Sequence, residues 1–214
     1  MKPMRISGLL VLGLVGITAA MTVRSAGLRT FEVDATKSRA VIDVGKAGAL
    51  GFAAGHTHEV IAPAVRGVIH VDSQDWSHSD VRLDMDATAL KVTGKGEPPE
   101  DVPKVQEVML SDQVLDVRQY PKIIFQSTSV AVQAHTATTM NLAVSGRLTL
   151  RNVTRPLTVP VNGQLEAGTL TATGRFLLKQ TDYNIKPISV GGVVKVKDAL
   201  TISFTIVARD RGVP

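Results

Sequence analysis

The sequence contains no cysteine in 214 residues, and aromatic side chains make up only 4% of it, with a single tryptophan. Without cysteine the chain forms no disulfide, uses no thiolate nucleophile and offers no thiolate ligand to zinc or to an iron–sulfur cluster. Few aromatic rings also argue against a surface on which nucleic-acid bases stack. These absences exclude disulfide-stapled folds and weigh against nucleic-acid recognition.

A strong charge of one sign is also lacking. The formal net charge is +5, but residues 1–26 contribute three basic side chains, Lys2, Arg5 and Arg24, and no acidic one. The remainder carries 21 basic and 19 acidic residues, too small an excess to attract nucleic acid strongly. With 44% hydrophobic residues, this remainder is typical of one globular domain, and we expect no nucleic acid as a partner.

Only the N-terminus has a long hydrophobic run. Residues 1–5 are basic, residues 6–23 are uncharged and largely apolar, and Thr18-Ala19-Ala20 offers the small side chains of a cleavage site. This pattern predicts a secretory signal peptide, and an uncleaved N-terminal membrane anchor is the alternative. Either segment exports the domain of residues 28–210, so we expect a periplasmic or secreted protein.

After this segment, the chain is a succession of predicted strands. Residues 81–87 alternate strictly between apolar and charged side chains, which indicates a strand with one buried face. Asn162-Gly163, Glu166-Ala167-Gly168 and Gly191-Gly192 are typical of turns between strands. Further strands are predicted over residues 30–34, 40–45, 65–72, 123–133, 142–150, 157–164, 170–178 and 200–208.

One segment has the spacing of a helix. Val102, Val105, Val108 and Met109 fall on one helical face within residues 100–111, and Pro103 suits a first turn. The sequence therefore predicts an all-β fold of about eight antiparallel strands with one helical insertion. A closed barrel is favoured, because it leaves no exposed sheet edge and has room for one small ligand. A sandwich of two sheets is the alternative fold.

Some predicted strands are apolar on both faces. Ile123 and Phe125 are expected to face one way, and Ile124 and Val130 the other. A barrel with a covered wall or a lipid inside uses both faces, although filling a core is the commoner role of any one apolar residue.

Two longer motifs are more specific than this pattern. YPKIIFQS (residues 120–127) is followed by GRLTLRNVTRPL (residues 146–157) and later by QTDYNI (residues 180–185). In this order, the chain resembles the YceI-like family of periplasmic polyisoprenoid-binding proteins over about residues 30–208. Gln180 and Asn184 stand where that family usually has Arg and Gly, but Asn also adopts the left-handed turn conformation.

The resemblance implies a lipocalin-like barrel around an apolar tunnel, with a long-chain isoprenoid, quinone-like or acyl lipid as partner and no catalytic residue, cofactor or resident metal. The helix of residues 100–111 is a candidate lid. The sequence is compatible with contact with a membrane surface and with a homodimer. Candidate tail-binding residues are Phe52, Leu83, Met85, Phe125, Leu148, Phe176 and Phe204, and candidates for the head-group end are His56, His58, Glu59, Asp182 and Tyr183.

The histidines leave an alternative open. On an extended strand, His56 and His58 share a face and lie about 6–7 Å apart, which suits zinc or copper, with Glu59, His70 or His135 as further ligands. The second hypothesis is therefore a metal-binding protein or a metal-dependent enzyme. The third is a structural envelope stress protein with a filled core and no ligand.

Overall fold

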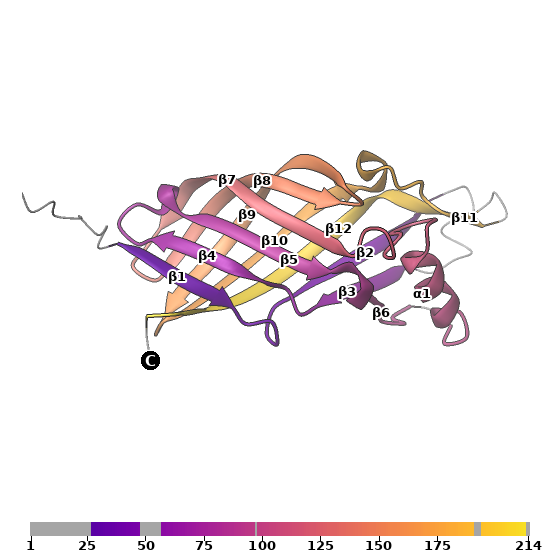
Figure 1. Cartoon of the computed structure of the whole chain (residues 1–214), viewed down its shortest axis with the longest axis horizontal. Helices are drawn as coiled ribbons and strands as arrows, with labels where there is room; N and C mark the ends of the chain where they lie inside the picture. Colours follow the sequence, from indigo (N-terminus) through magenta and orange to yellow (C-terminus); the bar gives the residue numbers. More distant parts are fainter. Residues whose placement is uncertain (1–26, 48–56, 97, 191–193, 213–214) are drawn as a thin grey trace, which may run out of the picture.

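The described part of the chain is built from antiparallel strands with one α-helix (Figure 1). The computed structural model describes residues 27–47, 57–96, 98–190 and 194–212. The long strands are β7 (Lys122–His135), β8 (Thr139–Leu150), β9 (Val153–Glu166), β10 (Thr169–Lys179) and β12 (Val194–Asp210). The other elements are β1 (Leu28–Val33), β2 (Arg39–Ala47), β3 (His58–Pro63), β4 (Arg66–Asp72), β5 (Asp80–Asp86), β6 (Lys91–Val92), β11 (Ser189–Val190), α1 (Val102–Leu110) and the 3-10 turns η1 (Trp76–His78), η2 (Ala87–Ala89) and η3 (Gln180–Tyr183).

Eight strands close into a barrel in the order β1-β4-β5-β7-β8-β9-β10-β12. The ring closes because β12 also pairs with β1, through Phe31 opposite Asp210 and Val33 opposite Ala208. Closure gives each of these strands a neighbour on both sides, which removes the edges of an open sheet. The predicted all-β, lipocalin-like antiparallel barrel with one helical insertion is confirmed, and the sandwich is excluded.

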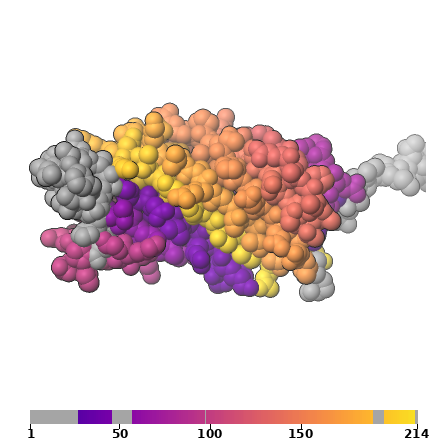
Figure 2. Space-filling view, turned by 180° about the vertical axis from the view of Figure 1, so that it is seen from behind, coloured from indigo at the N-terminus to yellow at the C-terminus, as the bar shows by residue number. Residues whose placement is uncertain are grey.

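Strand β12 joins the barrel to a second, smaller set of strands. Its 17 residues run as a diagonal yellow band across the molecule (Figure 2). One side pairs with β10, while the other pairs first with β2 and then with β1. Strands β2, β3 and β6 thereby extend the wall at one end of the barrel, where α1 lies, and β12 ends at the opposite end (Figure 1).

Alternation of side chains places the core inside the barrel. In β8, Leu142, Val144, Leu148 and Leu150 are all buried, as the period of two predicts. In β7 the prediction for Val130 is wrong, because the register shifts between Ser127 and Ser129. This bulge returns Val130 to the face of Phe125, and both side chains line the barrel interior.

Three turn predictions had different outcomes. Ala167 (φ 44°) and Gly168 (φ 75°) form the predicted turn between β9 and β10. The turn at Asn162-Gly163 is wrong, because both residues pair with β8 and β10 within β9. Gly191-Gly192 lies outside the described residues. Asn184 adopts the left-handed conformation expected of it (φ 57°, ψ 28°).

Within the described residues, no helix combines the length and apolar character needed to cross a bilayer. The signal peptide or anchor predicted over residues 1–26 lies outside them.

Candidate functional site

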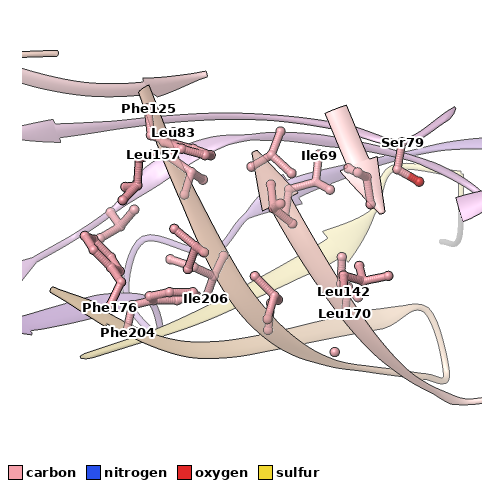
Figure 3. Close-up of a pocket in the computed structure, with 18 of the residues that line it drawn as sticks. Ile69, Ser79, Leu83, Phe125, Leu142, Leu157, Leu170, Phe176, Phe204 and Ile206 are labelled. Atoms are coloured by element: carbon pink, nitrogen blue, oxygen red, sulfur yellow. The ribbon is translucent and has the colours of Figure 1, made fainter. Parts of the chain in front are cut away.

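The barrel encloses an inner cavity of about 150 Å³ (Figure 3). Phe176 and Phe204 lie at one end of the view, and Leu142, Leu170 and Ser79 lie at the other. The described residues that line this cavity carry no charged side chain. They are Ala40, Val65, Ile69, Val71, Trp76, Ser79, Val81, Leu83, Met85, Phe125, Val130, Met140, Leu142, Val144, Leu148, Leu157, Val159, Val161, Gly163, Leu170, Ala172, Phe176, Ile202, Phe204 and Ile206.

Three strand glycines explain why this interior is not filled. A Cβ atom at Gly146 would lie 2.6 Å from the ring of Phe125, and one at Gly174 would lie 2.5 Å from the ring of Phe204. One at Gly163 would lie 2.6 Å from Cγ of Met140. The side chains of Phe125, Phe204 and Met140 therefore occupy space that a Cβ atom on the neighbouring strand would take.

A second cavity of about 660 Å³ lies at the α1 end of the barrel. Val105, Val108 and Met109 of α1 form part of its lining, and the barrel and its β2–β3 extension supply the rest. Its lining residues are Ala40, Ile42, Val44, Gly45, His58, Val60, Ala62, Met85, Leu90, Asp101, Lys104, Val105, Val108, Met109, Val114, Leu115, Ile123, Leu148, Leu150, Phe176, Leu178, Gln180, Ile185, Ile188, Val196, Leu200 and Ile202.

The two cavities adjoin inside the barrel. Ala40, Met85, Leu148, Phe176 and Ile202 line both of them. The site is therefore a pair of adjoining apolar cavities, a smaller inner one and a larger outer one, which together we call the tunnel. This shape suits a molecule with a long apolar tail more than it suits a compact polar substrate.

Six of the seven residues predicted to contact a lipid tail lie on this tunnel. Leu83, Phe125 and Phe204 line the inner cavity, and Met85, Leu148 and Phe176 line both cavities. Phe52 lies outside the described residues. Their role in binding a lipid tail stays a prediction.

The predicted head-group residues on β3 diverge. His58 lines the outer cavity, whereas Glu59 points to the other face of the strand, where Lys95 Nζ donates to its carboxylate at 2.7 Å. Thr93 also donates to Glu59, at 3.1 Å. Hydrogen bonding to Lys95 lowers the pKa of Glu59, so this carboxylate is held as an ion-pair partner. His56 lies outside the described residues.

The other two predicted head-group residues belong to η3 and line neither cavity. Tyr183 is buried, and this burial raises the pKa of its phenol. Asp182 is exposed, and its backbone carbonyl accepts a hydrogen bond from Arg155 Nε at 2.8 Å. In the same turn, Gln180 reaches the outer cavity and donates from Nε2 to the Lys197 carbonyl at 2.8 Å.

Two charged residues of the outer cavity were not among the predicted site residues. Asp101 and Lys104 lie at the start of α1 and line the cavity together with His58 and Gln180. The helical spacing predicted α1 itself, but only the tertiary fold places its first turn against the barrel. Polar groups therefore gather at the wide end of the tunnel, while the narrow end is apolar.

Helix α1 is attached to β6 through one side chain. Gln106 Oε1 accepts from the Val92 amide at 2.8 Å, and Gln106 Nε2 donates to the Leu90 carbonyl at 2.9 Å. No residue of α1 is fully buried. The helix therefore covers the outer cavity, and its partly buried residues Val105 and Met109 pack against the core at this end of the barrel.

The histidines of the described chain form no metal centre. Within these residues, no group of three His, Cys, Asp or Glu side chains is placed to hold a metal ion. His70 contacts the Asp80 carboxylate at 3.1 Å on the exterior, and His58 lies on the outer cavity. The predicted pairing of His56 with His58 is not tested, because His56 lies outside these residues.

Comparison with known proteins agrees with this architecture. The model of the YceI-like domain matches residues 31–208. No curated protein sequence matches the chain.

Solved structures share the fold at low identity. BcnA of Burkholderia cenocepacia is 19% identical with a TM-score of 0.62, over 82% of this chain and 98% of BcnA. A polyisoprenoid-binding domain from Saccharophagus degradans, implicated in plant cell wall breakdown, is 14% identical with a TM-score of 0.61, over 84% of this chain and 98% of that domain. The YceI protein of Campylobacter jejuni is 11% identical with a TM-score of 0.52, over 69% of this chain and 81% of its own.

Proposed function

The chain belongs to the YceI-like family, and from this membership we propose that it is an exported, non-catalytic protein that holds a long-chain isoprenoid or acyl lipid inside its barrel for sequestration or transport. The observation that carries the proposal is the tunnel formed by the two adjoining cavities. Each methylene buried there contributes about 0.8 kcal/mol to affinity. The polyisoprenoid-binding domain of Saccharophagus degradans supports the class of ligand, and the pattern of residues 1–26 supports export.

The tunnel also assigns an orientation. The apolar inner cavity suits the tail, while His58, Asp101, Lys104 and Gln180 at the outer cavity provide hydrogen-bonding and charged groups for a head group. A hollow interior argues against the structural hypothesis of a filled barrel, because natural cores are packed to high density unless the space is used.

Native mass spectrometry of the exported protein, purified without detergent and followed by organic extraction, tests the proposal. We expect one adduct of several hundred daltons per chain that extracts as an isoprenoid or acyl lipid. Ala40, which lines both cavities, provides an occluding variant, Ala40→Leu, that should lose the adduct. Val41→Leu is the matched control, because Val41 lines neither cavity, and it should keep the adduct.

Other outcomes contradict the proposal. A bare protein mass, or equal adduct occupancy in the two variants with both correctly folded, overturns it. A small adduct that a chelator removes from the wild type, and that His58→Ala abolishes, supports the metal hypothesis instead.

A further inference from the structure

The tunnel has a floor at the end opposite α1. Trp76 in η1 lines the inner cavity and is only 8% exposed. The Asp72 carboxylate accepts from the amides of Gln74 and Asp75 at 2.9 and 3.2 Å, and Asp75 caps η1 by accepting from the Ser77 amide at 3.0 Å. These bonds fix the short turn that carries the indole, so the floor is held in place by its own loop.

The volume above this floor is small. A cavity of ~150 Å³ lined by apolar side chains stays dry and holds one benzene molecule, so the inner cavity accommodates about six carbon atoms, slightly more than one isoprene unit. Phe125, Phe176 and Phe204 lie at one end of this cavity, and Phe176 also lines the outer cavity (Figure 3). Two of the rings approach Gly146 and Gly174 closely. A tail passes between these rings only if its end is slim and apolar.

We propose that Trp76 is a chain-length determinant: the lipid tail enters from the α1 end, and the indole stops it after about six carbon atoms beyond the phenylalanines. The inference rests on the proposed function, and it adds tail length as the property that the barrel selects. The floor makes each additional carbon unfavourable once the inner cavity is full, because close-packed interiors accept no surplus methylene without strain.

Trp76 is the only tryptophan in the chain, so its fluorescence reports contact with the tail directly. The probes are two forms of hexadecanoic acid, one brominated on the terminal carbon and one brominated next to the carboxylate, titrated into lipid-free full-length protein. Bromine quenches indole fluorescence on contact. We expect both acids to bind and only the terminally brominated acid to quench Trp76.

Variants then test the length limit. Each variant is offered a mixture of saturated fatty acids of increasing length, and mass spectrometry of the bound fraction shows which chain lengths it prefers. Trp76→Leu should shift the preference toward longer acids. Ala172 lines the inner cavity, and Ala172→Leu should shorten the preferred tail by about three carbon atoms, the number that Leu adds. Thr173→Leu is the matched control on the exposed face of the same strand and should leave the preference unchanged.

The outcomes separate this inference from the proposed function. If the lipid-free protein binds no fatty acid, the length determinant fails, and the proposed function fails with it only if the purified protein also carries no lipid adduct. If both brominated acids bind but neither quenches Trp76, only the length determinant fails. The same conclusion follows if both acids bind and quench Trp76 equally. An unchanged preference in folded Ala172→Leu overturns it as well, even where Trp76→Leu does not fold.

Discussion

At the scale of single residues, the hollow interior depends on glycines that accept a neighbour's side chain. The three positions differ in what a new Cβ atom would meet. At Gly163 the close atoms all belong to the flexible side chain of Met140, whereas at Gly174 they include the backbone carbonyl of Pro160 at 2.5 Å. The Met140 side chain can shift to relieve part of this contact, whereas the backbone of a paired strand cannot.

We therefore predict that Gly174→Ala lowers the free energy of unfolding by about 1–3 kcal/mol, the usual cost of overpacking. Gly163→Ala should stay within about 1 kcal/mol of the wild type, because the lower entropy of its unfolded chain offsets part of the strain. Urea unfolding of both variants measures the difference. Equal destabilisation would contradict the role assigned to the Pro160 carbonyl.

The same residues show where inference from sequence stops. Asn162-Gly163 has the composition of a turn, but its glycine makes room for Met140 on the neighbouring strand, and pairing across strands is invisible in a local pattern. Asn184 was predictable because the left-handed conformation is an intrinsic preference of that residue. Local chemistry thus predicted the conformation at Asn184 and failed at Asn162-Gly163, where a residue on the neighbouring strand decides the conformation.

At the scale of elements, α1 is a cover joined to the barrel by Gln106 and by partly buried apolar side chains. The two hydrogen bonds of Gln106 satisfy an amide and a carbonyl of the β6 region. The apolar face of the helix is only partly buried, because it packs against the edge of the core and also lines the outer cavity. Elements with few buried contacts open at low free energy, and a binding site that must load and release a ligand needs such an element.

Gln106→Ala removes both hydrogen bonds, each worth about 0.5–1.5 kcal/mol. We predict faster amide hydrogen exchange in α1, by about tenfold, with unchanged exchange in the long strands β8 and β10, and faster dissociation of a bound lipid. Glu107→Ala, at an exposed position next to it, is the control and should match the wild type. Exchange in α1 as slow as in β8, with and without lipid, would contradict the role of the helix as a lid.

Most of the elements followed from periodicity, and the exceptions have physical causes. β8 and β10 were predictable because each has one buried face, and such a strand places an apolar residue inward at every second position. β3 was missed, since it is short and ends at Pro63, and β9 starts four residues before its predicted start, with Pro156 inside it. The bulge in β7 reversed the expected direction of Val130, because one extra residue changes the face of the residues that follow, here as far as the second register shift between Val132 and Ala134.

At the scale of the whole molecule, the tunnel exists only while the barrel stays closed between β1 and β12. Phe31 and Ala208 on this seam are fully buried, and Arg29 Nε donates to the Asp210 carboxylate at 2.6 Å. Arg211 and Glu32 form a further ion pair at 3.1 Å. Charged pairs on the outside of the seam therefore support the strand pairing that seals the apolar interior.

The carboxylates of this seam predict its response to acid. The Gly212 amide and then Arg29 lower the pKa of Asp210, and the Thr36 hydroxyl lowers that of Asp34. A carboxyl group with a lower pKa in the folded state than in the unfolded chain stabilises the fold fully above its unfolded pKa, about 3.9 for Asp. This contribution is lost as the pH falls through the folded pKa.

We therefore predict that these two groups leave the free energy of unfolding unchanged between about pH 7 and pH 5 and lower it progressively below about pH 4. Asp210→Asn should be less stable than the wild type at pH 7 and should lose less on acidification, because the group that takes up the proton is gone. Urea unfolding over this pH range measures both effects, with Asp112→Asn at an exposed position as the control. If Asp210→Asn and the wild type lose the same stability in acid, the closure of the barrel does not depend on this carboxylate, and the pairing of β1 with β12 rests on its backbone bonds and on the burial of Phe31 alone.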